Sequence, residues 1–192
     1  MKNQNAKKEL KIKLRREFRK KREFDYPKVN KMILGRVKEF LGTELEKNNR
    51  DHICIYWPLK DEVDLRSLRR LYGNKLALPA IRRSKILTYH RWESDNLKPD
   101  LVGIPAPTIK EELKPKDIRL ILVPALAIDQ KGFRLGYGGG FCDRLIANKE
   151  WAQIPSFVVL PHACIFSEFL PIEDWDIPFD GWITEHGKYK SR

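Results

Sequence analysis

The segment Ile118-Arg119-Leu120-Ile121-Leu122-Val123-Pro124-Ala125-Leu126-Ala127-Ile128 decides the fold. Apart from Arg119 it holds only apolar side chains and one proline. A nearly continuous apolar run is typical of a central strand that is covered on both faces. We therefore expect a strand over 118–128, at the centre of a sheet with helices on both sides.

Outward from this segment, strand patterns alternate with helical ones. Strands are expected at 52–57, 75–81, 85–92, 156–160 and 182–184, and helices at 65–71, between Asp64 and Gly73, and at 141–148. Residues 93–116 hold Pro99, Pro105, Pro107 and Pro115 and are expected to form a long surface connection. The alternation predicts an α/β layered fold with a mainly parallel sheet flanked by helices.

Two helices are predicted ahead of the first strand. Leu10, Leu14 and Phe18 recur every four residues, as one apolar stripe of a helix requires. A second helix from Pro27 to about Lys47 has its buried side at Ile33, Val37, Phe40 and Leu41. We expect a single domain over 1–192, in which a basic helical part (1–48) packs on the flank of an α/β core (52–185).

Composition narrows the class of protein. The chain has 192 residues, 42% of them hydrophobic and 33% charged, which suits one sizeable core. It has no apolar run of 18 residues and no apolar stretch typical of a secretory signal near its basic start. Cys54, Cys142 and Cys164 form no CxxC pair, so neither a disulfide framework nor a zinc site is indicated. We expect a monomer in the cytoplasm, without a membrane partner.

Positive charge is concentrated near the start of the chain. The formal net charge is +12, and ten of the sixteen residues from Lys7 to Arg22 are Lys or Arg. Such a surface attracts polyanions, which include nucleic acid, anionic lipid and phosphorylated or polycarboxylate small molecules. A solvated helix face that serves solubility is the alternative interpretation.

A glycine-rich loop follows the central apolar segment. Residues 134–144, RLGYGGGFCDR, place four of the chain's 11 glycines within five positions. Glycines let several backbone N–H groups approach one anion, and Arg134 and Arg144 supply charged donors for phosphate oxygens. Asp143 offers a hard oxygen ligand suited to Mg²⁺. The loop matches neither the Walker nor the dinucleotide pattern. It predicts a phosphate-binding loop, with a tight turn that needs positive φ angles as the alternative.

The same residues resemble a known signature. Val123–Asp129, Gly132 and Arg134–Arg144 together are similar to the motif of the 5-formyltetrahydrofolate cyclo-ligase family, also called 5,10-methenyltetrahydrofolate synthetases. Lys11–Arg15, Tyr56–Asp64 and Leu170–Pro178 resemble three further elements of that family. The resemblance therefore spans nearly the whole chain.

The resemblance implies an enzyme that uses MgATP. The family converts 5-formyltetrahydrofolate to 5,10-methenyltetrahydrofolate and releases ADP and phosphate. ATP phosphorylates the formyl oxygen, and nitrogen 10 of the folate then closes the ring. A formamide oxygen is a poor leaving group, so coupling to phosphoryl transfer makes physical sense. The expected substrate is a small molecule, a folate with or without a polyglutamate tail.

The resemblance also implies roles for particular residues. For ATP these are Lys11, Arg15 and the loop residues Arg134, Leu135, Gly136, Tyr137, Gly138, Gly139, Gly140, Phe141 and Cys142. The catalytic set is Arg134, Arg144 and Asp143, and the magnesium carboxylates are Asp143 and Asp176. Lys7 offers a competing register for Lys11, and a solvated lysine is the simpler alternative at that position.

For the folate the resemblance implies contacts from Trp57, Glu62, Tyr137, Gly138, Gly139, Gly140 and Phe141. Trp57 could stack on a flat ring or be a core aromatic of its strand. Glu62 could accept hydrogen bonds from the donor-rich pterin edge or be a helix-start charge. The chain departs from the family pattern at Cys142, where a tyrosine is usual, so the hydrogen bond of that phenol is lost.

Two other functions compete with this interpretation. A nucleic-acid-binding protein would explain the basic first helix and the sequence pI near 9.6, but no zinc-finger spacing or RRM-type aromatic motif accompanies them. A nucleotide sensor without turnover would use the same fold and loop. Steep salt-dependent RNA binding would indicate the first, and formation of the methenyl product would exclude both.

Overall fold

The structure is a computed structural model that describes residues 2–22, 26–45, 52–82, 86–108 and 111–191. Its centre is a seven-stranded sheet in the order β12-β11-β9-β6-β1-β2-β3. The five inner strands run parallel, and β12 and β3 pair antiparallel at the two edges. The strands span β1 His52–Cys54, β2 Leu76–Ile81, β3 Leu87–Arg91, β6 Ile118–Pro124, β9 Ser156–Val159, β11 Gly181–Thr184 and β12 Gly187–Lys190.

The apolar run that predicted a central strand is buried on both faces of this sheet. From β6, Leu120 and Leu122 join one hydrophobic cluster, while Ile121 and Val123 join the other. Successive side chains of a strand point to opposite faces, so both faces of β6 need cover. The mainly parallel α/β fold is thus confirmed, with both clusters packed against one sheet as a single domain.

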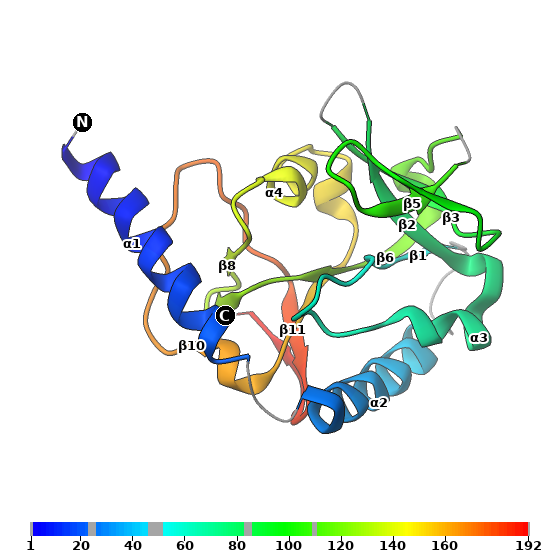
Figure 1. Ribbon diagram of the computed structural model, residues 1–192, viewed down its shortest axis with the longest axis horizontal. Coiled ribbons are helices and arrows are strands. Elements are labelled where there is room, and N and C mark those ends of the chain that lie inside the picture. The colour runs from blue at the N-terminus through cyan, green and yellow to red at the C-terminus, as the bar shows by residue number, and fades with distance from the viewer. Residues whose placement is uncertain (1, 23–25, 46–51, 83–85, 109–110, 192) are drawn as a thin grey trace.

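Two long helices cover the sheet from different sides. Helix α2 (Tyr26–Leu45) buries Ile33, Val37 and Leu41 in one cluster, as the sequence predicts. Helix α1 (Lys2–Lys20) buries Leu14 and Phe18 in the other, and its N-terminal part projects from the flank (Figure 1). Leu10 of the predicted apolar stripe is 44% exposed, because this part of α1 extends beyond the hydrophobic cluster that buries Leu14 and Phe18. The expected end of the second helix near Lys47 lies outside the described residues.

Short elements complete the chain. The remaining helices are α3 Arg69–Tyr72 and α4 Phe141–Ile146, with 3-10 turns at Arg66–Leu68, Gly73–Lys75, Pro115–Asp117, Trp151–Gln153 and His162–Cys164. The Asp64 carboxylate accepts a 2.9 Å hydrogen bond from the Arg66 N–H, and Gly73, at φ 51°, ends α3 as predicted. No helix in the described ranges is both long and apolar enough to cross a membrane.

The prediction of one strand over 118–128 is wrong, because the apolar run divides between two sheets. After β6 ends at Pro124, β7 (Ala127–Asp129) enters a three-stranded sheet with β8 (Arg134–Leu135) and β10 (Ile165–Phe166). Both halves are buried, so hydrophobicity gives no sign of the break. Pro124, which lacks the N–H that a longer ladder needs, is the one local signal. The glycine loop consequently follows β8 of the small sheet and not the central strand.

Three further expectations need correction. Residues 93–116 contain the antiparallel pair β4 (Leu97–Pro99) and β5 (Pro105–Pro107), and Ala106 is buried. Strand β1 ends at Cys54 and not at Trp57, and α4 ends at Ile146 and not at Asn148. The C-terminal hairpin from β11 to β12 was not predicted, because β12 has alternating half-buried and exposed residues.

Gly181 on β11 provides a test of this hairpin. A Cβ at Gly181 would lie 2.0 Å from the backbone oxygen of Tyr189, which cannot move without disrupting β12. We expect Gly181→Ala to destabilise the protein by about 2–3 kcal/mol, as overpacking does. The matched control is Gly42→Ala on the exposed side of α2, where a Cβ meets nothing within 4 Å and helix propensity predicts a gain of about 0.5–1 kcal/mol. Urea unfolding of both variants measures the difference, and equal midpoints would contradict the assigned pairing.

Candidate functional site

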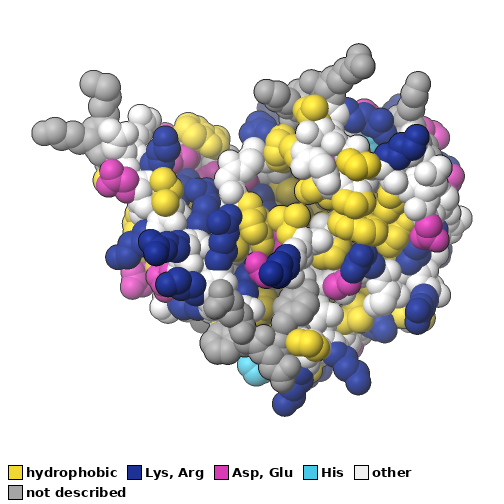
Figure 2. Space-filling model, viewed as in Figure 1, with side chains coloured by type: hydrophobic (Ala, Val, Ile, Leu, Met, Phe, Trp, Pro, Cys, Tyr) yellow, Lys and Arg dark blue, Asp and Glu magenta, His cyan; other side chains and the backbone are white. Residues whose placement is uncertain are grey.

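Two cavities have residues of the glycine loop in their walls. One has a volume of about 300 Å³ and a wall rich in charged side chains; the other has about 230 Å³ and is mainly apolar. Arg134 and Gly140 line both cavities. Figure 2 shows Lys and Arg side chains gathered over α1, beside a hollow edged by hydrophobic side chains. We call these cavities the charged pocket and the apolar pocket.

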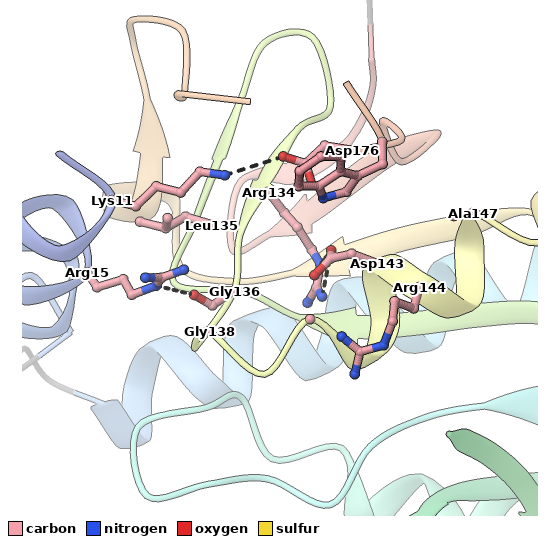
Figure 3. A pocket seen from close by; sticks show the side chains of 12 residues that line it. Lys11, Arg15, Arg134, Leu135, Gly136, Gly138, Asp143, Arg144, Ala147 and Asp176 are labelled. Atoms are coloured by element: carbon pink, nitrogen blue, oxygen red, sulfur yellow. Dashed lines mark hydrogen bonds and ion pairs between the residues drawn. The ribbon is translucent and has the colours of Figure 1, made fainter. Parts of the chain in front are cut away.

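The charged pocket is built by three separate parts of the chain. Helix α1 contributes Lys11 and Arg15, the loop and α4 contribute residues from Arg134 to Ala147, and the C-terminal segment contributes Trp175 and Asp176 (Figure 3). Of the residues that the structure describes, four cations, Lys11, Arg15, Arg134 and Arg144, and two carboxylates, Asp143 and Asp176, line its wall. This excess of positive charge suits a polyanion such as a triphosphate.

The cations are held in place by pairs within the protein. The Arg134 guanidinium, 7% exposed, donates from Nε to Asp143 Oδ1 at 2.9 Å and from Nη1 to the Pro124 oxygen at 2.8 Å. Lys11 Nζ lies 3.5 Å from Asp176 Oδ2, and Arg15 Nε donates to the Gly136 oxygen at 2.9 Å (Figure 3). Burial, together with the neighbouring Arg19, lowers the pKa of Arg15, and Asp143 opposes the shift.

The loop backbone explains the concentration of glycine. Gly138 has φ 108° and Gly140 φ 64°, a region that residues with a Cβ rarely adopt. The loop therefore has the positive φ angles that a tight turn needs. The same turn forms part of the walls of both pockets. The two sequence interpretations, turn and binding loop, do not exclude one another.

The apolar pocket adjoins strands β2, β3 and β6. Its wall includes Trp57, Tyr89, Val102, Tyr137 and Phe141. Trp57 is partly buried, with the Arg66 guanidinium 4.8 Å from its ring centre and Trp92 edge-on at 6.1 Å. A flat apolar ligand with one polar edge would suit such a cavity.

A buried polar network lies beside this pocket. Glu62, 3% exposed, accepts a 2.8 Å hydrogen bond from the Leu59 N–H and another from the Tyr137 hydroxyl. Burial raises the pKa of Glu62, although the Leu59 N–H, Arg22 and Tyr137 oppose the shift. Burial likewise raises the pKa of Tyr137. Glu62 is therefore a buried acceptor and not the solvated helix-start charge of the alternative interpretation.

Arg22 contacts Tyr137 of this network and the backbone at Asp61 and Ala125. The sequence did not predict a role for it. Its Nη1 donates at 2.9 Å to both the Asp61 oxygen and the Tyr137 hydroxyl, and its Nη2 donates to the Ala125 oxygen. The side chain is 6% exposed, unlike most of its basic neighbours. Among ten cations in sixteen positions no local signal marks the buried one.

Asp129 is a second residue whose role the sequence did not show. It is fully buried, and its Oδ1 accepts the N–H groups of Lys131 and Phe133, both at 3.0 Å. Its Oδ2 accepts the Leu170 N–H at 3.0 Å, which ties the C-terminal segment to the β7–β8 turn. The spacing of Asp129 and Gly132 could have predicted the turn, but not the contact with Leu170.

The carboxylates of the charged pocket suit a metal ion whose other ligands are water and substrate phosphates. Among the described residues no group of three or more His, Cys, Asp or Glu side chains could hold an ion without other ligands. Asp143 and Asp176 nevertheless line the same charged pocket. Mg²⁺ is usually held by one or two carboxylates together with substrate phosphates and water, so this donor set fits an ion carried by a triphosphate.

Several known proteins are similar to this chain in sequence. The sequence profile described as the 5-formyltetrahydrofolate cyclo-ligase family matches residues 3–185. The chain belongs to this family. A 5-formyltetrahydrofolate cyclo-ligase of Haemophilus influenzae is 30% identical over 144 residues, which cover 70% of this chain and 75% of the relative. The Escherichia coli K12 protein of the same name is 28% identical and covers 69% of this chain and 76% of its own length.

Solved structures agree with the cyclo-ligase assignment. The NMR structure of Aquifex aeolicus 5,10-methenyltetrahydrofolate synthetase has a TM-score of 0.77 and 26% identity, and the match covers 97% of this chain and 93% of that one. A Mycoplasma pneumoniae 5,10-methenyltetrahydrofolate synthetase has a TM-score of 0.67 at 17% identity, covers 91% and 98%, and supports the fold alone. The chain is therefore an enzyme of the cyclo-ligase family.

Every expected site residue of this cyclo-ligase family member lines one pocket or the other. The residues of the glycine loop, however, are shared out between the two pockets. Leu135, Gly136, Gly138, Asp143 and Arg144 line the charged pocket, whereas Tyr137, Gly139, Phe141 and Cys142 line the apolar one. Lys11 lines the charged pocket, whereas Lys7 pairs with Glu173 at 3.8 Å outside that wall, which favours the Lys11 register. Cys142 is partly buried, and burial raises the pKa of its thiol, so it contributes a neutral wall.

Proposed function

We propose that the chain converts 5-formyltetrahydrofolate to 5,10-methenyltetrahydrofolate with MgATP, releasing ADP and phosphate. One observation carries the proposal: the charged and apolar pockets share the wall formed by Arg134 and Gly140. A transferred phosphoryl group must meet the oxygen that accepts it, so the two ligands must lie side by side. The glycines keep this wall free of Cβ atoms and so let both ligands approach it.

The triphosphate would occupy the charged pocket. Lys11 and Arg15 lie on one face of α1, Arg134 comes from β8 and Arg144 from α4, so cations surround the pocket from several directions. Phosphoryl transfer needs positioning and charge neutralisation more than a nucleophilic side chain. Helix α1 and the α/β core both supply this wall, so residues 1–48 and 52–185 act as one functional unit.

Asp143 and Asp176 would hold the magnesium ion. When bound with the triphosphate, Mg²⁺ neutralises phosphate charge and favours cleavage of the terminal bond. In the structure each carboxylate is paired with a cation, Asp143 with Arg134 and Asp176 with Lys11. These pairs keep the two kinds of charge close together, so Lys11 and Arg134 could bind phosphate oxygens while Asp143 and Asp176 would supply carboxylate ligands to the metal.

The pterin part of the folate would occupy the apolar pocket. The exposed side of Trp57 offers a stacking surface, and the buried Glu62 carboxylate can accept hydrogen bonds from the N–H groups of the pterin edge. Tyr137 and Phe141 would cover the ring from the loop side.

In the reaction, the formyl oxygen attacks the terminal phosphorus of ATP, and the bond to the ADP oxygen breaks. Nitrogen 10 then attacks the formyl carbon and loses its proton, the carbon–oxygen bond breaks, and phosphate leaves with the former formyl oxygen and takes up that proton. Arg134, at the wall between the pockets, is placed to stabilise charge on the transferred group.

Turnover tests the proposal directly. Purified protein with MgATP and 5-formyltetrahydrofolate should form the strongly absorbing methenyl product, with ADP and phosphate released in equal amounts. Omitting ATP should abolish product formation, because ring closure then lacks an activated oxygen.

The rival functions give different results in the same experiment. MgATP binding without product would support a nucleotide sensor. Steep salt-dependent binding to random RNA without turnover would support a nucleic-acid-binding protein. Either result would overturn the proposed reaction.

A further inference from the structure

One aromatic side chain of the charged pocket has no role in the chemistry described above. Trp175 lines this pocket, yet it is 65% exposed and belongs to neither hydrophobic cluster of the described residues. Among the described residues, the other apolar side chains of this wall are Leu135 and Ala147. A large exposed aromatic in a cationic pocket is not explained by core packing or by phosphate binding.

The backbone around Trp175 is held in place. The Asp176 carboxylate accepts the Glu173 N–H at 2.9 Å, and the Asp176 N–H donates to the Glu173 oxygen at 3.0 Å. Lys11 contacts both carboxylates of this turn, at 3.3 Å to Glu173 and 3.5 Å to Asp176. Asp129 fixes the start of the same segment through Leu170. The backbone that carries the indole is therefore anchored beside the pocket, while the indole itself is not packed into the hydrophobic clusters of the described residues.

We propose that the indole of Trp175 is the platform on which the nucleotide base stacks. This inference rests on the proposed function and identifies where the rest of the nucleotide lies. The charged pocket, at about 300 Å³, is at the small end for a ligand site, so it suits the phosphates while the base extends over its edge. Every nucleobase has a π-face, so stacking on an exposed indole favours purines without reading their hydrogen-bonding edges. Low selectivity between ATP and GTP follows.

The test separates the base from the phosphates. Base–aromatic stacking predicts that Trp175→Ala raises the KM for MgATP roughly 5- to 150-fold and leaves kcat largely unchanged. Inorganic tripolyphosphate with Mg²⁺ has no base, so its inhibition constant should not change. Trp175→Phe should keep most of the affinity for MgATP. MgATP, but not tripolyphosphate, should quench tryptophan fluorescence in the wild type, and Trp175→Phe should abolish that quench.

Phe169→Ala is the matched control. Phe169 lies in the same C-terminal segment and is 66% exposed, but it lines neither pocket and contacts Lys131 instead. Its replacement should leave the KM for MgATP unchanged.

Three results would overturn the inference. An equal loss of tripolyphosphate and MgATP binding in Trp175→Ala would make Trp175 a support of the phosphate pocket. An unchanged KM for MgATP would place the base elsewhere, and strong discrimination of ATP from GTP would require edge-reading contacts. Failure of the proposed function is distinguishable, because the wild type would then form no methenyl product even where MgATP quenches its fluorescence.

Discussion

Replacing Arg134 with methionine is expected to lower kcat/KM by at least about 10³-fold, because this guanidinium lies at the wall common to both pockets. An arginine that stabilises a transferring phosphoryl group is worth about 10³–10⁵ in rate. The same change removes the partner of Asp143 and of the Pro124 oxygen. Breaking a largely buried ion pair should therefore also cost about 3 kcal/mol of stability.

Turnover and urea unfolding of Arg134→Met measure the two effects separately. Arg144→Met is the companion variant, since Arg144 lines the charged pocket but is exposed. It should lower turnover with little change in the unfolding midpoint. Arg134→Lys keeps the charge and loses the two-pronged geometry, so it should recover part of the stability and little of the rate. Wild-type turnover in folded Arg134→Met would remove Arg134 from the reaction.

The second large effect is expected for Glu62→Gln. The amide keeps the shape of the side chain but replaces one acceptor by a donor, which would face donors of the pterin edge. Hydrogen bonds to charged groups contribute about 1.5–3 kcal/mol each, so kcat/KM for the folate should fall about 100-fold or more. The KM for MgATP should stay the same, because Glu62 lines only the apolar pocket. Asp61→Asn, an exposed neighbour outside both walls, is the control and should match the wild type.

Glu62 also predicts a pH dependence. Burial raises its pKa in the folded protein above the unfolded value, so the folded state binds this proton more tightly. The contribution of Glu62 to stability is therefore present at low pH and lost as the pH rises through the raised pKa. Glu62→Gln has no such loss, so its melting temperature relative to the wild type should rise between acid and neutral pH. The wild-type rate should fall as Glu62 is protonated, and Glu62→Gln should lack that limb; identical pH profiles would contradict the assignment.

The amino-acid sequence predicts the fold and the candidate site to different extents. The spacing of Ile33, Val37 and Leu41 predicts a buried helix face, because the apolar residues of an amphipathic helix recur with the helical period. The division of 118–128 between two sheets was not predictable, because a strand buried in either sheet has the same composition. In the site, the glycines, arginines and aspartate of one loop are contiguous and carry their own signal.

Residues that act through distant contacts left no such signal. Arg22 reaches Tyr137 across 115 positions, and Asp129 reaches Leu170 across 41. A buried arginine among exposed ones is set apart only by what folds around it. In the sequence Trp175 is distinguished only as part of a segment that resembles the family, because its exposure at the charged pocket depends on how the turn beside Asp176 packs against α1.

The amino-acid sequence by itself determined the elements whose physics is local: the helices, the strands with continuous apolar character, the turns that need glycine, and the loop chemistry that suits phosphate. Tertiary structure alone decided that the loop lines two cavities, so that Arg134 and Gly140 belong to both walls and Tyr137 and Asp143 to different ones. The reason is that backbone propensity acts over a few residues, whereas a cavity is enclosed by side chains from α1, the sheets and the C-terminal segment, whose proximity depends on the packing of the whole core.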